Sequence, residues 1–241
     1  MTLDISRQPD NALQAVLFDM DGLLVDTEGL WFEVEVAAMA ELGCRLGPEH
    51  AERVVGGPMD RVVRYMIEVC RADIRPAELE GMIITGMFSA LRHGVSLQPG
   101  AKNLLAEIAA DHMPCALVSS SHRSMMEAVL DSVGRQYFPV TVAGDEVTQM
   151  KPSPEPYLTA AARLGVDPVH SVVLEDSPTG VASAEAAGCV TVAVPSVAPI
   201  PATDGRVVVT SLEELSLARL RTLVLERRPA APPRIRGATA G

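Results

Sequence analysis

Two acidic residues stand two positions apart directly after a short apolar run. Residues 15–18 are Ala-Val-Leu-Phe, and they are followed by Asp19, Met20, Asp21 and Gly22. On a chain that leaves a strand, residues two apart can point to the same side, so the two carboxylates could act as a nucleophile and an acid–base group. Asp and Gly also favour turns, and alone the motif could be a turn. Its place after an apolar run favours chemistry.

Other polar residues stand where further apolar runs end. They are Ser119 after residues 115–118, Lys151 before Pro152, and Glu175 and Asp176 after residues 171–174. Singly these are weak signals, because Ser caps helices and a Lys before Pro is ordinary. Two adjacent acids that close a buried strand are costly unless something binds them. Carboxylates, a hydroxyl and an ammonium group in one place indicate a site for a hard cation, such as Mg²⁺, and a phosphate.

The apolar runs themselves predict a parallel sheet. They are short, rich in Val and do not alternate, which is typical of strands buried on both faces. The predicted strands are residues 15–18, 115–118, 140–143, 171–174, 190–194 and 207–209, and the predicted helices between them are residues 100–111, 122–134, 155–165 and 178–188. This alternation predicts a doubly wound, Rossmann-like α/β core, in which ligands bind outside the carboxyl ends of the strands. The polar strand ends should therefore meet in one cleft.

Residues 29–94 break the alternation, because only helical patterns are found there. The predicted helices are residues 30–42, 48–55, 59–72 and 76–92. Five methionines fall in this stretch, and methionine at helical spacing is typical of core packing. We expect a core of residues 1–28 and 95–225, a small all-helical cap domain of residues 29–94 inserted after the first strand, and a disordered tail of residues 226–241.

Composition limits the partners. Lys and Arg number 20 and Asp and Glu 31, so the formal net charge is −11. This charge gives no electrostatic footprint for nucleic acid or an anionic membrane. No apolar run approaches the ~18 residues of a membrane span, and the first residues are unlike a signal peptide. An anionic ligand would need a local reversal of charge, which a divalent cation provides.

The four cysteines do not form a metal motif. They are Cys44, Cys70, Cys115 and Cys189, and none lies within four positions of another. We expect buried, reduced thiols in a cytoplasmic protein.

Three further residue types also call for an interpretation. Trp31 begins the first helix of the insert, where it could pack in the cap or contact a substrate. One of Ser119, Ser120 and Ser121 is expected to cap the helix that follows. The five histidines show no ligand spacing and are expected at the surface or with satisfied ring nitrogens.

Taken in order, these motifs resemble those of the haloacid dehalogenase superfamily. They are Asp19-Met-Asp21-Gly, Val-Ser119-Ser, Lys151-Pro and Glu175-Asp176-Ser-x-x-Gly180, and the resemblance runs from about residue 14 to residue 215. The insert resembles the C1 cap of the β-phosphoglucomutase-like branch. The segment from Asp21 to Trp31 looks most like phosphatases that act on hexose or hexitol phosphates and 2-deoxyglucose 6-phosphate.

The resemblance implies a role for each acidic residue. Asp19 would attack phosphorus and form an aspartyl-phosphate, and Asp21 would protonate the leaving oxygen and then activate water. The carboxylates of Asp19 and Asp176 and the backbone carbonyl of Asp21 would bind Mg²⁺, with Glu175 in support.

The same resemblance implies a phosphate pocket. Ser119 and Lys151 would hold phosphate oxygens, and Ser120 and Arg123 would assist. The cap would close over the substrate and exclude bulk water.

The chain also departs from the mutases of this branch. They carry a His where this chain has Trp31, and they carry a Lys and an Arg around the loop that corresponds to residues 55–59, which is uncharged here until Arg61. We therefore expect a Mg²⁺-dependent phosphatase that acts on a small phosphate monoester, most of all a sugar phosphate. The partner is then a small phosphorylated metabolite, without nucleic acid or membrane, and the protein a monomer or weak homodimer.

Three alternatives remain open. A phosphomutase of the β-phosphoglucomutase type would need a second phosphate site in the cap. A phospho-receiver domain also gathers acids, a hydroxyl and a Lys, but it lacks a cap and an acid two positions after its phosphoacceptor. A catalytically silent sugar-phosphate binder would not need every catalytic position filled, as they are here.

Overall fold

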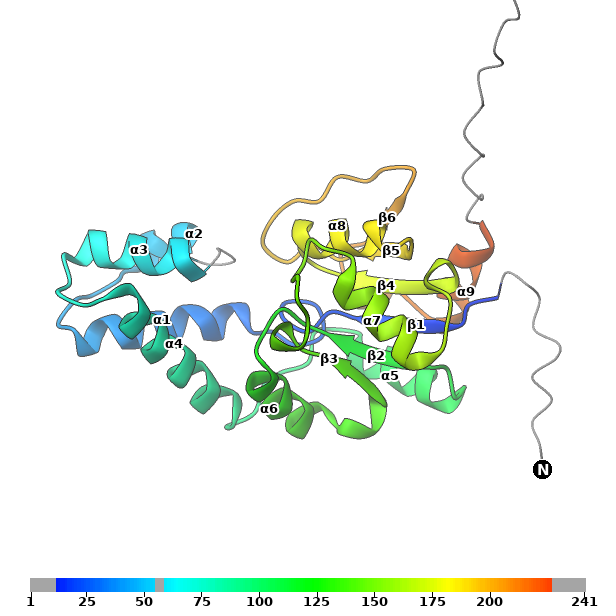
Figure 1. Ribbon diagram of the computed structural model, residues 1–241, viewed down its shortest axis with the longest axis horizontal. Helices are drawn as coiled ribbons and strands as arrows, with labels where there is room; N and C mark the ends of the chain where they lie inside the picture. Colours follow the sequence, from blue (N-terminus) through cyan, green and yellow to red (C-terminus); the bar gives the residue numbers. More distant parts are fainter. Residues whose placement is uncertain (1–11, 55–58, 227–241) are drawn as a thin grey trace, which may run out of the picture.

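The computed structural model describes residues 12–54 and 59–226 and divides into a core built on a sheet and a helical cap (Figure 1). The cap follows the first strand, and the chain then returns to complete the core. Within the described ranges, no helix is both long and apolar enough to cross a membrane.

The core sheet has six strands in the order β3-β2-β1-β4-β5-β6, and every pairing is parallel. The strands are β1 (Ala15–Phe18), β2 (Cys115–Val118), β3 (Val140–Val142), β4 (Ser171–Glu175), β5 (Val190–Ala193) and β6 (Arg206–Val208). All six predicted strands are confirmed, each to within one residue at either end. Every residue of β1, β2, β4 and β5 is buried, as their apolar sequences require between two helical layers.

Helices cover both faces of the sheet. Ala15 and Leu17 of β1 belong to one apolar cluster, and Val16 and Phe18 belong to another, because successive side chains of a strand point to opposite faces. The first cluster is covered by α7 (Glu155–Leu164) and α8 (Pro178–Ala186), and the second by α5 (Ala101–Ala110), α6 (Arg123–Val133) and α9 (Leu217–Glu226). This arrangement confirms the doubly wound α/β fold. Short 3₁₀ turns complete the core, namely η2 (Arg135–Tyr137), η3 (Gly144–Glu146), η4 (Pro168–His170) and η5 (Leu212–Glu214).

The described part of the cap is entirely helical. It comprises α1 (Glu28–Glu41), η1 (Pro48–His50), α2 (Ala51–Val54), α3 (Met59–Cys70) and α4 (Pro76–Leu91). Helix α4 packs against both α1 and α3. Met39, Met66 and Met87 are fully buried between these helices, which confirms the packing role expected of them. The predicted helix over residues 48–55 is instead a 3₁₀ turn followed by α2.

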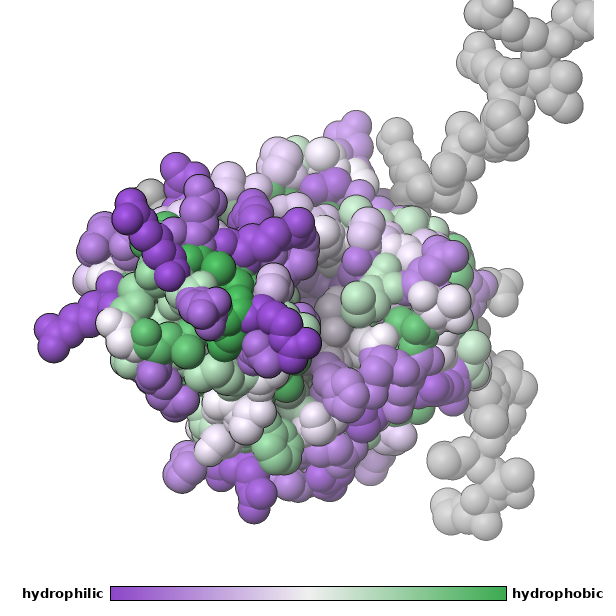
Figure 2. Space-filling model, turned by 60° about the vertical axis from the view of Figure 1, so that its left-hand side comes forward, coloured by the Kyte–Doolittle hydropathy of each residue, from purple (hydrophilic) through white to green (hydrophobic). Residues whose placement is uncertain are grey.

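The outer surface of the cap is mixed in character. Figure 2, in which the cap comes forward, shows hydrophobic residues gathered on it among hydrophilic ones. The domain boundaries proposed from the sequence stay a prediction, and the tail from residue 227 onward lies outside the described residues; Glu226 itself ends α9.

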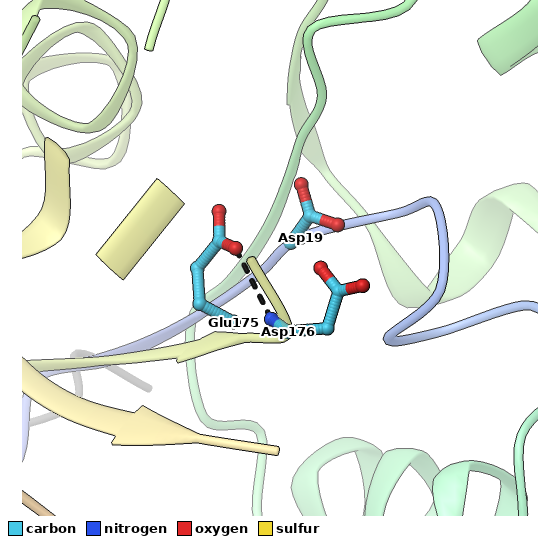
Figure 3. A group of neighbouring side chains, drawn as sticks. All are labelled: Asp19, Glu175 and Asp176. Carbon is cyan, nitrogen blue, oxygen red and sulfur yellow. Dashed lines mark hydrogen bonds between the residues drawn. The ribbon is translucent and has the colours of Figure 1, made fainter. Parts of the chain in front are cut away.

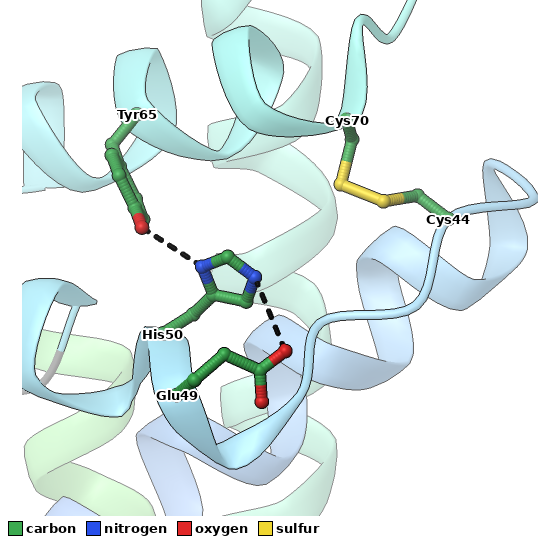
Figure 4. The surroundings of a disulfide bond; sticks show 5 residues. All are labelled: Cys44, Glu49, His50, Tyr65 and Cys70. Atoms are coloured by element: carbon green, nitrogen blue, oxygen red, sulfur yellow. Dashed lines mark hydrogen bonds and ion pairs between the residues drawn. A yellow bond between two sulfur atoms is a disulfide. The ribbon is translucent and has the colours of Figure 1, made fainter.

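A disulfide bond corrects the expectation that all four cysteines are reduced. Cys44, in the turn after α1, is bonded to Cys70 at the end of α3, with their Cα atoms 5.7 Å apart (Figure 4). Cys115 and Cys189 are buried and are not part of a disulfide bond, as expected. The separation of 26 positions in the sequence excludes a zinc-type cysteine pair, but it does not show that the packing of α1 and α3 brings the two sulfurs together. Only Cys115 and Cys189 therefore still support the expectation of reduced thiols in a cytoplasmic protein.

Candidate active site

The polar residues predicted from strand ends meet at the carboxyl edge of the sheet. β1 lies between β2 and β4, so Asp19 stands between Ser119 on one side and Glu175 with Asp176 on the other. The Asp19 amide donates to the Leu174 carbonyl at 3.0 Å, which extends the β1–β4 pairing to the site itself. The parallel register thus aligns the ends of three separate segments of the chain.

Lys151 is buried at the centre of the site, with only 4% of its side chain exposed. Its ammonium group donates to Asp19 Oδ1, to Glu175 Oε1 at 2.7 Å and to the Val118 carbonyl at 3.0 Å. Burial opposes its charge, but the carboxylates of Asp19 and Glu175 prevail and raise the pKa of Lys151. The charged ammonium form of Lys151 is therefore favoured at this site.

The surroundings of the Asp19 carboxyl disfavour its ionised form. Burial and the charge of Glu175 raise its pKa well above the ordinary value, and Lys151 offsets only part of this. A further positive charge at the site would therefore favour the ionised, nucleophilic form of Asp19.

Both carboxylate oxygens of Glu175 accept several hydrogen bonds. Tyr157 donates to Oε1 at 2.6 Å, and the amides of Asp176 and Ser177 and the Ser177 hydroxyl donate to Oε2 at 3.1–3.3 Å. With Lys151 included, both oxygens have several donors, and the side chain is fully buried. Glu175 is therefore suited to hold its neighbours in place.

Asp21 is held by three hydroxyl groups. Ser119 and Ser121 donate to Oδ2 at 3.0 and 2.8 Å, and Thr27 donates to Oδ1 at 3.1 Å. The Ser119 hydroxyl in turn accepts the Ser121 amide at 2.9 Å. These bonds fix the direction of a carboxylate that lines the cleft, as an acid–base group requires.

No serine of the triplet caps α6. The cap is His122, whose Nδ1 accepts the amide of Ser124 at 3.3 Å. The expectation that one of the serines takes this role is wrong, because Ser119 and Ser121 are turned to Asp21 instead.

Asp19, Glu175 and Asp176 could hold a metal ion together. Each offers a carboxylate oxygen, and these oxygens lie within 4.8 Å of one another (Figure 3). Gly22, with φ +80°, permits this approach, because a Cβ there would lie 2.2 Å from Asp176 Oδ2. Three carboxylates around one ammonium leave excess negative charge, and oxygen ligands of this kind suit Mg²⁺. The donor set fits that ion.

A cleft of about 530 Å³ opens above these groups, between core and cap. Its core wall includes Asp19, Asp21, Ser120, Lys151 and Asp176, and its cap wall is formed by Trp31, Glu35, Val54, Met59, Val62, Glu80 and Ile84. The structure thus brings the proposed nucleophile, acid–base group, phosphate cation and Trp31 to one cavity. Ser119 is buried beneath it, bonded to Asp21.

Arg123 is the predicted site residue that the structure places elsewhere. Its guanidinium group bonds Glu146 at 2.6 Å and the Thr141 hydroxyl at 2.8 Å, and it does not line the cleft. Arg123 is the first residue of α6, and its side chain points toward Thr141 of the edge strand β3.

Several residues of the site were not proposed for it from the sequence. They include Thr27 and Ser121, which bond Asp21, Tyr157, which bonds Glu175, Ser196, which bonds Asp176, and Glu35 and Glu80 of the cap wall. Glu35 follows Trp31 by one helical turn, a spacing that could have indicated a shared face. Tyr157 and Ser196 carry no such signal, because tertiary packing alone places them.

Comparisons with known proteins agree with this geometry. The family described as "Haloacid dehalogenase-like hydrolase" matches residues 16–194. Hexitol phosphatase B of Escherichia coli O157:H7 is 33% identical over 210 residues, which cover 86% of this chain and 93% of that protein. The fructose-1-phosphate phosphatase of Escherichia coli strain K12 is 32% identical over 176 residues, 72% and 92% of the two chains. A putative β-phosphoglucomutase from Thermotoga maritima has a similar crystal structure, with a TM-score of 0.72, 28% identity and coverage of 88% and 99%.

Proposed function

The chain belongs to the haloacid dehalogenase-like hydrolase family, and from that premise we propose that it is a Mg²⁺-dependent phosphatase of small sugar or polyol monophosphates. The observation that carries the proposal is Asp19 at the floor of the cleft, bonded to the buried Lys151 and beside a carboxylate pair. The names of the relatives, a hexitol phosphatase and a fructose-1-phosphate phosphatase, support the substrate class.

The first step transfers the phosphoryl group to the protein. An Asp19 oxygen attacks phosphorus, the bond from phosphorus to the ester oxygen breaks, and Asp21 gives its proton to the departing alcohol. Lys151 lies where it can offset charge on both Asp19 and the phosphoryl oxygens. Ser119 and Ser120 are the proposed hydroxyl contacts of those oxygens.

The second step releases inorganic phosphate. Asp21, now ionised, takes a proton from water as the water oxygen attacks phosphorus, and the Asp19–phosphorus bond breaks. The three hydroxyl donors of Asp21 hold its carboxylate in one direction through both steps. Both starting protonation states are then restored.

We propose that Mg²⁺ is held by the carboxylates of Asp19 and Asp176 and the Asp21 carbonyl, with Glu175 as a supporting residue. When bound, the ion supplies positive charge that lets a phosphate dianion enter an acidic cleft. Glu175 accepts hydrogen bonds at both oxygens already, which favours a supporting role over a direct one.

A phosphomutase is the second candidate, since a putative β-phosphoglucomutase shares the fold. Such an enzyme must grip a second phosphate in its cap. The described cap residues that line the cleft include no Lys, Arg or His, Arg61 is exposed, and Arg64 bonds Asp60 on the surface. Residues 55–58 of the uncharged loop lie outside the described residues. Family membership and the cap argue against a phospho-receiver domain.

A phosphate-release assay tests the proposal. Hexose and hexitol monophosphates are supplied with and without Mg²⁺ to the wild type and to Asp19→Asn. We expect Mg²⁺-dependent release that the substitution abolishes. Conversion of β-glucose 1-phosphate to glucose 6-phosphate, primed with a bisphosphate and faster than phosphate release, would identify a mutase instead.

A cytoplasmic location and a monomer or weak homodimer stay predictions. The Cys44–Cys70 disulfide runs against the first, because such bonds are rare in a reducing compartment. Thiol labelling of the protein in fractionated cells would test the location, and light scattering the oligomeric state.

A further inference from the structure

The ammonium group of Lys151 is fully engaged by the protein itself. It has three N–H donors, and it contacts three acceptors, namely Asp19 Oδ1, Glu175 Oε1 at 2.7 Å and the Val118 carbonyl at 3.0 Å. The ring of Tyr157 lies beside it as well, with its centroid 4.9 Å from Nζ. A phosphate that binds Lys151 at the floor of the cleft must therefore take one of these donors from a protein acceptor.

Glu175 is the acceptor that stays hydrogen-bonded when Lys151 turns to a ligand. The Tyr157 hydroxyl donates to the same oxygen, Oε1, at 2.6 Å. The other oxygen, Oε2, accepts the amides of Asp176 and Ser177 and the Ser177 hydroxyl. A buried carboxylate that lost its last donor would be costly, but here the hydroxyl of Tyr157 remains on Oε1.

The surrounding helices hold Glu175 and Tyr157 in this arrangement. Tyr157 is fully buried on α7, which packs against β1 and β2 at the centre of the sheet. Gly180 of α8 lies against the Glu175 carboxylate, because a Cβ there would be 1.8 Å from Oε1. The carboxylate is thus confined between two helices, and it cannot follow the ammonium group toward the cleft.

We propose that Tyr157 is a positioning residue of the phosphate site, whose hydroxyl keeps Glu175 hydrogen-bonded while Lys151 gives a donor to the phosphate. Tyr157 is not among the described residues that line the cleft, so it acts through Glu175 and Lys151 and not on the substrate. Without its hydroxyl, the hydrogen bonds of the described chain leave Lys151 as the sole donor to Oε1, and the carboxylate holds the ammonium more firmly. The inference rests on the proposed function, in which Lys151 is the cation of the phosphate.

The test measures inorganic phosphate binding by calorimetry in the presence of Mg²⁺. Tyr157→Phe removes the hydroxyl and keeps the ring beside Lys151. We expect the Kd for phosphate to rise about tenfold, as for one charge-assisted hydrogen bond. The KM for a hexitol phosphate should rise by a similar factor and kcat change less than about threefold, because the exchange is made when the phosphate binds.

Tyr65→Phe is the matched control. Its hydroxyl also has a side-chain partner, His50 at 2.8 Å, but it lies in the cap and does not line the cleft. We expect its Kd for phosphate to stay within about twofold of the wild type.

A second pair of variants separates positioning from a structural role. In Glu175→Gln the competing charge is gone, so the addition of Tyr157→Phe should change the Kd for phosphate less than about twofold. A structural role would lower the melting temperature of Tyr157→Phe without this dependence on residue 175. All binding measurements are made below the melting temperature of every variant.

Three results would overturn the inference: an unchanged Kd in Tyr157→Phe, an equal rise in Tyr65→Phe, or the full rise in the Glu175→Gln background. A wild type that binds no phosphate would overturn it too. Hydrolysis of p-nitrophenyl phosphate by the wild type tests the phosphatase function separately. If phosphate binds but no ester is hydrolysed, that function is wrong, and the Kd values still decide the role of Tyr157.

Discussion

The core and the cap differ in the kind of residue that each of them buries. In the core, Lys151 and Glu175 are charged groups that are almost wholly buried, and each is tied by several hydrogen bonds. In the cap, the interior is mainly apolar and includes Met39, Met66 and Met87, whose unbranched side chains adapt to irregular gaps. The core thus holds its charged groups by several hydrogen bonds each, whereas the cap offers a wall that can vary without disturbing them.

In the proposed phosphatase, reaction and substrate selection would therefore be carried by separate parts of the chain. The proposed catalytic groups all come from strand ends or core loops, and the cap supplies only the upper wall of the cleft. Changes in the core should therefore abolish turnover of every ester, and changes in the cap should alter which ester is used or how stable the cap is.

The largest effect is expected from Asp19→Asn. A carboxamide is a far weaker nucleophile, so kcat should fall by at least about a thousandfold for all esters. Burial and Glu175 already disfavour the ionised carboxyl, so the neutral Asn should leave the melting temperature unchanged or raise it. Rate assays and thermal melting check both parts. Activity above about a tenth of the wild type would show that Asp19 is not the nucleophile.

Glu175 and Asp176, the two acids at the end of β4, should differ in their effects on Mg²⁺ binding and on folding. Asp176→Ala should raise the Mg²⁺ concentration for half-maximal activity by about tenfold or more, because Asp176 lines the cleft and Glu175 does not. Glu175→Ala should act less on Mg²⁺ and more on folding, since Lys151 and Tyr157 lose a buried partner, at about 3–5 kcal/mol.

Activity titrated with Mg²⁺ and urea unfolding without the ion measure the two effects. An equal or reversed order in the Mg²⁺ titration would assign the direct ligand to Glu175.

The sequence predicted the core better than the cap wall. Strand ends such as Asp19 and Asp176 are determined by local pattern and by the rule that parallel strands end at one edge. Glu35 reaches the cleft, and Cys44 reaches Cys70, only through the packing of cap helices against one another. Arg123, which the resemblance places in the phosphate pocket, lies outside the cleft in the structure for a related reason, because position alone does not say which way a long side chain turns.

The disulfide is a cap feature, and its removal should leave the core chemistry intact. In the chain-entropy view, a link across 26 residues stabilises the folded state by about 3.5 kcal/mol. Cys44→Ser should therefore lower the melting temperature under oxidising conditions and not under reducing ones. The rate with p-nitrophenyl phosphate should change less than about twofold at a temperature where the variant is folded. An equal loss in both conditions would mean that the bond does not form in the protein.

The smallest effect on stability is expected from Arg123→Ala, which tests where the core site ends. The resemblance places this residue in the phosphate pocket, but here its guanidinium group bonds Glu146, Glu127 and Thr141 at the edge of the sheet. These contacts and the carboxylates of Glu146 and Glu127 raise the pKa of Arg123 against the desolvation that opposes its charge. Because the guanidinium group already has these partners, we do not expect Arg123 to turn toward a bound phosphate.

We therefore expect Arg123→Ala to change kcat and KM less than about threefold and to lower stability by about 1 kcal/mol, as for a partly exposed ion pair. Arg163→Ala is the matched control, because Arg163 also bonds Glu146 and the Thr141 carbonyl but was never a site candidate. Similar kinetics in both variants would confine the phosphate cations to Lys151. A KM raised more than about tenfold in Arg123→Ala alone would mean that Arg123 exchanges Glu146 for substrate phosphate when the cleft is filled, since a lost charge-assisted contact has about that effect.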